Sequence, residues 1–331
     1  MPRALVLDTK DGDLQADVRE VDPENLPDGD VLVEVLYSSL NYKDGLAITG
    51  SAQVIRGEYP FVPGIDLVGR VVESASDTYA PGDLVIQTGW WLGEVEWGGY
   101  AELMRVQSDH LVRLPDGLSP REAMTIGTAG FTAMLSVLAL EDHGLQPGDD
   151  GEVVVTGASG GAGSIAIALL AARGYGPVAS TGSEAAHDYL RGLGAARIVD
   201  RSAFSNGPDR PMESGQWKGA IDAVGGQTLA TLIAQMERHG SIASFGNAGG
   251  HTLETTVLPF ILRGVNLLGI DSNTCPNDRR RRAWQQLAET LSTEHFDRIS
   301  QQVIGLDDLP AASRDIVDGN VQGRIVVDVK A

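Results

Sequence analysis

A glycine-rich segment near the middle of the chain has the residue types and the spacing of a phosphate-binding loop. Four glycines fall within seven residues, between an apolar run and a stretch of small residues: Gly157, Gly160, Gly161 and Gly163. Residues without a side chain let the backbone turn sharply and let its N–H groups approach a pyrophosphate. A helix after the loop would direct the positive end of its dipole at that charge. The spacing G-x-x-G-G-x-G differs from the strict G-x-G-x-x-G, yet its place between strand and helix favours dinucleotide binding over a purely structural turn.

The segment after the second predicted strand bears on which nicotinamide would bind. A NAD site usually places Asp or Glu there to bind the ribose 2′-OH. This chain has the neutral donors Ser180, Thr181 and Ser183, and Arg201 follows the third strand, a set that suits a 2′-phosphate. Glu184 is the alternative, because it could bind the ribose, although the first turn of a helix is the interpretation we prefer for it. The pattern favours NADPH.

The elements that must position this loop alternate along the chain. From Glu152 onward, short apolar runs alternate with helical stretches, which indicates a doubly wound α/β domain with a parallel sheet covered on both faces. The predicted strands are 153–156, 178–181, 197–199, 220–224, 241–245 and 265–270. The predicted helices are 162–173, 185–193, 227–238 and 256–262.

The first third of the chain has a different pattern. Apolar or alternating segments at 4–7, 31–37, 67–73 and 100–106 are separated by Gly, Pro, Asp and Asn, which predicts a compact, barrel-like sheet. A capping box, Ser119-Pro120-Arg121-Glu122, then starts helical sequence that includes 128–140. The tail carries an Arg-rich helix near 278–291, a helix near 308–318 and a strand at 324–330. We expect this tail to return to the first domain.

Composition and charge exclude several classes of protein. The 331 residues are 42% hydrophobic and 21% charged, which excludes a disordered chain. The sequence has no run of 18 apolar residues and no secretion signal, so we expect a soluble, cytoplasmic protein. The net charge of −20 argues against binding to nucleic acid or to an anionic membrane. With Cys275 as the only cysteine and no ligand spacing among the histidines, we expect no metal.

Several stretches resemble the medium-chain dehydrogenase/reductase superfamily, in its zinc-free quinone-oxidoreductase branch. The matching segments are 38–44 (SSLNYKD), 63–66 (PGID), 126–133 (IGTAGFTA), 156–163 (TGASGGAG), 259–263 (PFILR) and 269–272 (GIDS). Within that branch the chain is similar to the NADPH-dependent acrylyl-CoA reductases, through LNYKD and the Trp-rich insert 88–99 (TGWWLGEVEWGG). The resemblance implies a GroES-like catalytic domain at 1–122, a Rossmann domain for NADPH at 123–270 and a C-terminal return at 271–331.

The zinc-binding members of the superfamily hold their catalytic metal through Cys and a Gly-His-Glu sequence. The corresponding places here are Asn41 and Gly64-Ile65-Asp66. A structural zinc lobe of four cysteines is also impossible with one cysteine. The resemblance therefore implies hydride transfer without a metal.

The resemblance also implies a set of cofactor-binding residues, with two departures from the family pattern. The set is Tyr42, Ser159, Gly160, Gly161, Ala162, Thr181, Gly182, Ser183, Arg201, Asn247, Ile261 and Ser272. Ser183 stands where close relatives have Arg, so Arg201 would carry more of the phosphate charge. Asn247 stands at a position that is usually apolar.

The implied reaction reduces the C2–C3 double bond of acrylyl-CoA to give propanoyl-CoA. Tyr42 is the catalytic candidate, as a hydrogen-bond donor to the thioester oxygen, and the alternative is that it only packs against the nicotinamide. Arg279 and Arg280, in the only dense basic run, are candidates for the CoA phosphates, with a solvated helix face as the alternative. The tryptophans of the insert could line the acyl or adenine pocket, or simply pack locally.

Two other functions stay open at this point. One is an NADPH:quinone or enone oxidoreductase without a CoA site, and the other is a non-enzymatic NADPH-binding protein. The complete glycine loop and the retained Asn41–Asp44 motif weigh against the second. The predicted last strand, 265–270, resembles the edge through which relatives pair, so we expect a homodimer.

Overall fold

The computed structural model describes residues 1–148, 150–300 and 302–331, and these divide into two compact units. Unit 1 comprises Met1–Thr128, Ser272–Ala288 and Ser300–Ala331. Unit 2 comprises Ala129–Asp271 and Glu289–Ile299. Two parts of the C-terminal segment thus belong to unit 1 and one part to unit 2, while the predicted domains 1–122, 123–270 and 271–331 stay a prediction.

Unit 1 is built on an irregular, mainly antiparallel sheet with the strand order β14-β15-β3-β4-β5-β7, and β6 pairs with β3. Its strands are β3 (Val31–Leu40), β4 (Asp66–Ser74), β5 (Leu84–Thr88), β6 (Leu103–Val106), β7 (Val112–Arg113), β14 (Gln302–Ile304) and β15 (Ile325–Asp328). A separate hairpin joins β1 (Arg3–Lys10) and β2 (Asp13–Glu20). Because β15 pairs with β3, the end of the chain completes the first domain's sheet.

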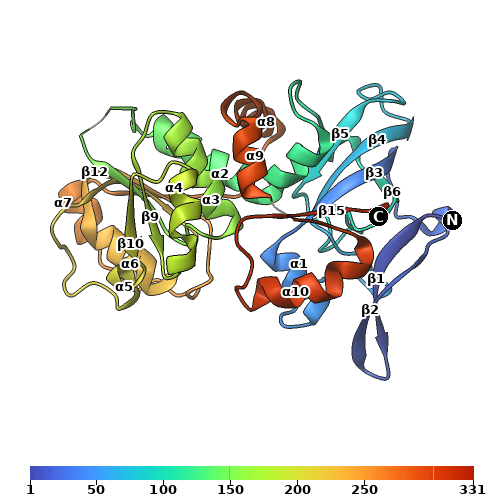
Figure 1. The fold of residues 1–331 in the computed structure, drawn as a ribbon, viewed down its shortest axis with the longest axis horizontal. Coiled ribbons are helices and arrows are strands. Elements are labelled where there is room, and N and C mark those ends of the chain that lie inside the picture. Colours follow the sequence, from blue (N-terminus) through green and yellow to red (C-terminus); the bar gives the residue numbers. More distant parts are fainter. Residues whose placement is uncertain (149, 301) are drawn as a thin grey trace. The chain divides into compact units, whose positions relative to one another are not determined.

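The helices of unit 1 lie against this sheet. They are α1 (Tyr42–Thr49), α8 (Asn277–Thr290, which ends just beyond the unit) and α10 (Leu309–Val317), with short 3-10 turns at Pro23–Asn25, Ser108–His110 and Leu306–Asp308. Helices α1 and α10 contact each other, as Figure 1 shows. Residues of β1, β3, β4 and β15 supply the apolar core, whose burial is the main favourable term for folding.

Unit 2 contains a six-stranded parallel sheet in the order β10-β9-β8-β11-β12-β13. Its strands are β8 (Glu152–Val155), β9 (Pro177–Thr181), β10 (Arg197–Asp200), β11 (Trp217–Asp222), β12 (Met236–Ser244) and β13 (Asn266–Gly269). This is the 3-2-1-4-5-6 order of a dinucleotide-binding fold, whose strand order reverses between β8 and β11. The predicted doubly wound α/β fold is confirmed.

The helices of unit 2 cover both faces of its sheet, as Figure 1 shows. They are α3 (Gly161–Ala172), α4 (His187–Gly192), α5 (Ser202–Ser205), α6 (Gly226–Gln235), α7 (Leu258–Arg263) and α9 (Thr293–Ile299), with a 3-10 turn at Glu184–Ala186. The predicted helix 227–238 ends early, because β12 begins at Met236 directly after α6. The sequence pattern did not predict β2, β5, β7, β14, α1, α5 and α9, because most of them are short and turn residues lie beside them.

Helix α2 (Pro120–Asp142) begins in unit 1 and continues into unit 2. The predicted capping box forms at its start, where Ser119 N–H donates to Glu122 Oε2 at 2.7 Å and Glu122 N–H donates to Ser119 Oγ at 3.3 Å. Gly127 interrupts the helix with φ of 49° and ψ of −159°. By length and composition α2 could cross a membrane, but its most apolar window is 89% buried, which is typical of a core helix.

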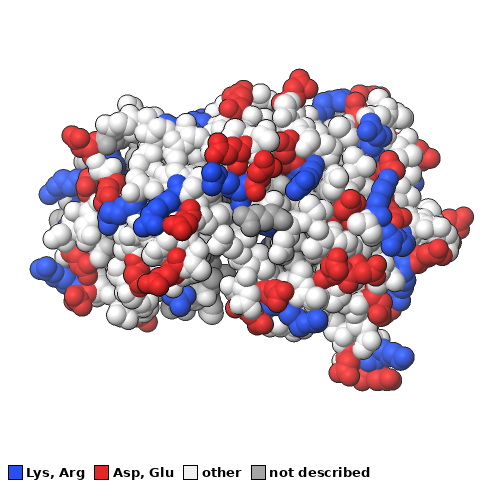
Figure 2. Space-filling model, viewed as in Figure 1, with Lys and Arg blue, Asp and Glu red and all other residues white. Residues whose placement is uncertain are grey.

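Acidic side chains are spread over the face shown in Figure 2, with basic side chains between them. This distribution accompanies a net charge of −20. Such a surface favours solubility and repels polyanions.

Candidate functional site

The glycine loop lies at the carboxyl end of β8, next to the point where the strand order reverses. Gly157 has a φ of +60°, a backbone conformation that favours glycine. A Cβ on Gly163 would overlap the carbonyl oxygen of Gly157, so the close approach of α3 to the turn requires glycine. Gly160 precedes α3 and provides no side-chain cap, which leaves the first N–H groups of α3 directed at the position of a bound anion.

The ends of β9 and β10 bring the predicted phosphate-binding residues together. Ser159 Oγ lies 3.2 Å from Thr181 Oγ1, which joins the glycine loop to the end of β9. The Arg201 guanidinium lies across Gly182, where a Cβ would come within 2.5 Å of Arg201 Nε. This close approach places a cation next to neutral donors, the arrangement that a ribose 2′-phosphate requires. Glu184 is exposed in the first turn of a 3-10 helix. These residues therefore fit NADPH.

A buried carboxylate supports the same edge of the sheet, and sequence reasoning missed it. Asp222, at the end of β11, accepts from Thr156 Oγ1 at 2.7 Å and from Gly225 N–H at 3.0 Å. Burial raises the pKa of Asp222, and these hydrogen bonds act in the opposite direction. Asp222 therefore fixes the turn after β11 beside the glycine loop, a role that only the strand order reveals.

Four other predicted cofactor residues lie outside the glycine loop and the ends of β9 and β10. Asn247 is exposed and follows β12, and Ile261 is 68% exposed on α7. Ser272 belongs to unit 1, as does Tyr42. Their roles toward the cofactor stay predictions.

Tyr42 is the first residue of α1, a helix that sequence reasoning treated as a loop. Its side chain is 50% exposed, so its hydroxyl is accessible to a ligand. Asn41 precedes the helix, and Asp44 accepts from Asn41 N–H at 3.0 Å, which closes a capping box. The position of Tyr42 is therefore set by the buried residues on either side of it.

Two buried carboxylates, Asp44 and Asp66, flank the Asn41 amide. Asn41 Nδ2 donates to Asp44 Oδ2 at 3.0 Å and to Asp66 Oδ2 at 2.9 Å. Asp66 also accepts from Thr128 N–H and Thr128 Oγ1, and so caps the helix that resumes after Gly127. Burial, and then the charge of Asp66, raise the pKa of Asp44 to about 7.

The cation of this network comes from the C-terminal segment, and sequence reasoning did not identify it. Arg324 is 4% exposed and its guanidinium lies 3.8 Å from Asp66 Oδ2. It donates to Asn41 Oδ1 at 3.0 Å and to Ser39 Oγ at 2.7 Å. A Cβ on Gly127 would collide with Asp66 and Arg324, so this glycine is required by the network. The end of the chain thereby fixes the segment that carries Tyr42.

The structure contradicts our expectation that Arg280 meets a CoA phosphate. Arg280 is 1% exposed, and it donates to Thr88 Oγ1 at 3.0 Å and to the Asn273 carbonyl at 3.2 Å. Its guanidinium also lies 5.5 Å from the centre of the Trp90 ring. The helical period of α8 explains the difference, because Arg280 lies on the buried face with Ala283, Trp284 and Leu287. Arg279 is exposed and remains a candidate. Arg280 instead holds the Trp-rich insert in place.

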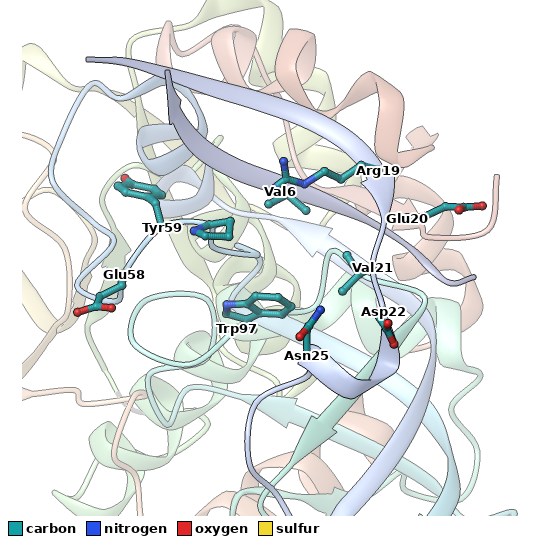
Figure 3. Close-up of a pocket in the computed structure, with 10 residues that line it drawn as sticks. Val6, Arg19, Glu20, Val21, Asp22, Asn25, Glu58, Tyr59 and Trp97 are labelled. Carbon is teal, nitrogen blue, oxygen red and sulfur yellow. The ribbon is translucent and has the colours of Figure 1, made fainter. Parts of the chain in front are cut away.

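A hollow of about 470 Å³ in unit 1 lies apart from the residues just described. The β1–β2 hairpin, Asn25, the Glu58–Pro60 turn and Trp97 line it. Figure 3 shows the Trp97 ring beside Asn25, while the carboxylates of Glu58 and Glu20 point away from that ring. Of the residues that the sequence suggested for a pocket, it contains only Trp97 of the insert.

Two family models and several known proteins match this chain. The family model "alcohol dehydrogenase GroES-like domain" matches residues 27–116, and the model "zinc-binding dehydrogenase" matches residues 161–293. Acrylyl-CoA reductase AcuI of Ruegeria pomeroyi is 50% identical over 333 aligned residues, which cover 100% of both chains. The chain belongs to the medium-chain dehydrogenase/reductase superfamily. The predicted GroES-like and Rossmann fold is thereby confirmed.

Solved structures of superfamily members hold nicotinamide cofactors. The yhdH oxidoreductase of Salmonella enterica, in complex with NADP, is 50% identical, with a TM-score of 0.96 and 99% coverage of each chain. The yhfP protein of Bacillus subtilis, with NAD bound, is 43% identical, with a TM-score of 0.94 and 99% coverage of each chain. Although one family model is named for zinc, the described residues contain no group of three His, Cys, Asp or Glu side chains that could hold a metal.

Proposed function

We propose that this protein reduces acrylyl-CoA to propanoyl-CoA with NADPH. The observation that carries the proposal is the 50% identity to an acrylyl-CoA reductase across the whole of both chains. The glycine loop, with Arg201 lying over Gly182, supports NADPH as the cofactor. When bound, NADPH supplies a hydride to the terminal carbon of the double bond. We propose that the enzyme works in the cytoplasm, without zinc and without nucleic acid or membrane partners.

The chain's own residues must then stabilise negative charge and control a proton. As the terminal carbon gains hydride, charge collects on the thioester oxygen as an enolate, and a proton must reach C2 to complete the reduction. A hydrogen-bond donor preorganised at that oxygen lowers the barrier. Tyr42 is our candidate donor, because a phenol hydroxyl can donate a hydrogen bond to an oxygen that gains negative charge.

A side-by-side substrate assay tests the function. NADPH consumption is measured with acrylyl-CoA, crotonyl-CoA and a benzoquinone, and each is repeated with NADH. We expect fast turnover with acrylyl-CoA and NADPH. Preference for the quinone would instead support the alternative, an NADPH:quinone oxidoreductase without a CoA site, and would leave the fold unaffected.

Substitution of Tyr42 by Phe separates catalysis from packing. If the hydroxyl donates to the enolate oxygen, Tyr42→Phe lowers kcat by about a hundredfold, because one oxyanion donor is worth roughly that much. The KM for NADPH should stay close to that of the unmodified enzyme. A kcat within twofold of the unmodified value would show that Tyr42 only packs against the cofactor.

Substitution of Arg201 by Gln tests the cofactor preference. We expect the KM for NADPH to rise about ten- to a hundredfold, because a charge-assisted hydrogen bond to the 2′-phosphate is lost. NADH lacks this phosphate, so its KM should not change. Glu184→Gln is the matched control after the neighbouring parallel strand, β9, and it should change neither value. A loss of NADH binding in Glu184→Gln would instead assign Glu184 to the ribose.

We also propose a homodimer formed through β13. This strand is at the edge of its sheet, and exposed apolar side chains lie on it and on the preceding helix: Val257, Leu258, Ile261, Leu262 and Leu267. An open apolar edge promotes pairing with a second copy. Light scattering at micromolar concentration should give the mass of two chains, and Leu267→Lys should lower it. A monomer mass for the unmodified protein would contradict the proposal.

A further inference from the structure

An exposed aromatic and cationic surface, formed by Trp91 and Arg56, lies on unit 1. Trp91 is 37% exposed, and the Arg56 guanidinium lies 4.9 Å from the centre of its ring. Arg56 is exposed and has no ion pair with the residues that the structure describes. An arginine without an ion pair keeps its guanidinium N–H groups available to an anionic ligand. We name this pair the Trp91–Arg56 platform.

The fold holds the platform in a conformation that side chains rarely adopt. Trp90 and Trp91 have φ angles of 55° and 61°. Asn273 secures both residues, since its carbonyl accepts from Trp90 N–H at 2.8 Å and its Oδ1 accepts from Trp91 N–H at 3.0 Å. Buried Arg280 in turn donates to the Asn273 carbonyl. Backbone in this region costs free energy and persists where surrounding contacts fix it, most often at ligand-binding sites.

The platform is connected to the helix that carries Tyr42. Arg56 N–H donates to the Glu94 carbonyl at 2.7 Å, and Glu94 N–H donates to the Trp91 carbonyl at 3.1 Å. The nearly buried Glu94 carboxylate accepts from Lys43 Nζ at 2.9 Å, and Lys43 follows Tyr42 in α1. Hydrogen bonds therefore connect the platform to the residue that follows Tyr42. Lys43 forms an ion pair with Glu94, whereas Arg56 forms none with the residues that the structure describes.

We propose that the Trp91–Arg56 platform binds the 3′-phosphoadenosine diphosphate end of CoA. An indole offers a face on which a purine stacks, and a guanidinium offers N–H groups to phosphate while it stacks on the ring. The flexible pantetheine arm would then reach from the platform toward Tyr42. This inference rests on the proposed function. It places the CoA nucleotide away from Arg280 of α8, which donates to Thr88 Oγ1 and to the Asn273 carbonyl.

Two substitutions test the platform by different routes. Arg56→Gln removes the cation and keeps a polar side chain, whereas Trp91→Gly removes the ring and suits the left-handed backbone. Arg279→Gln tests the competing site suggested by the basic run. Arg314→Gln is the matched control, because it makes the same charge change at an exposed arginine of α10. Each full-length variant is titrated with CoA by calorimetry in the presence of NADP⁺. The KM is then measured for acrylyl-CoA and for acrylyl-pantetheine, which lacks the nucleotide.

We expect the Kd for CoA and the KM for acrylyl-CoA to rise about tenfold in both platform variants. The KM for acrylyl-pantetheine should not change. A general structural defect would raise the KM for both substrates. Arg314→Gln should behave as the unmodified protein. The inference is overturned if both platform variants keep the Kd for CoA of the unmodified protein. It is also overturned if only Arg279→Gln raises that Kd.

The two proposals can fail separately. If the unmodified protein reduces acrylyl-CoA while the platform variants bind CoA normally, the platform falls and the proposed function stands. If the unmodified protein binds CoA, and the platform variants bind it more weakly, but no acrylyl-CoA is reduced, the platform proposal is supported and the proposed function is wrong. If it binds no CoA, the platform falls whatever the assay shows.

Discussion

Substitution of Arg324 by Ala is expected to lower the free energy of unfolding by about 3–5 kcal/mol, because it leaves buried carboxylates without their cation. The guanidinium is 4% exposed, faces Asp66 at 3.8 Å and donates to Asn41 and Ser39. These partners are buried. Urea denaturation of the full-length protein measures the change.

The same substitution should also reduce catalysis in protein that still folds. Asn41 and Asp44 set the start of α1, and Arg324 fixes Asn41, so its loss frees the segment that carries Tyr42. We expect Arg324→Lys to restore part of the stability, since it returns the charge with fewer hydrogen bonds. Arg314→Ala, on the exposed face of α10, is the control and should stay within about 0.5 kcal/mol of the unmodified protein. An Arg324→Ala variant as stable as this control would contradict the assigned role.

Substitution of Gly163 by Ala is expected to weaken NADPH binding by at least about tenfold, because the third glycine of such a loop permits close helix–strand packing. A Cβ at this position would overlap the Gly157 carbonyl oxygen and would lie 2.8 Å from Ala158 Cα. Both are backbone atoms, so no rotamer change relieves the collision. Helix α3 must therefore move away from the turn that cradles the phosphates. Fluorescence titration with NADPH measures the loss.

Gly176→Ala is the matched control for this effect. A Cβ on Gly176 would meet only Ala196 Cβ, at 3.7 Å, which is an ordinary contact. Gly176 also precedes β9, away from the carboxyl ends of the strands. The affinity of the Gly176→Ala variant for NADPH should equal that of the unmodified protein. Equal affinity in Gly163→Ala as well would show that the loop tolerates a wider helix–strand spacing.

The sequence by itself determined the architecture and the class of cofactor site. Strands from β8 to β13 were predicted because buried parallel strands are continuous apolar runs, and glycine spacing identified the loop after β8. The capping box at Ser119 was equally local, since its partners are three residues apart. Strands, the glycine loop and the capping box are predictable from the sequence because residues close together in the chain determine them.

Only the tertiary structure decided which polar side chains act together. Arg324 meets Asn41 across 283 positions of the chain, and no local pattern marks either as a partner of the other. Arg280 and Arg279 are adjacent and identical in type, yet one is buried under the Trp-rich insert and the other is exposed. Burial and long-range pairing fix the role of a charged group, because its cost or benefit depends on what surrounds it after folding.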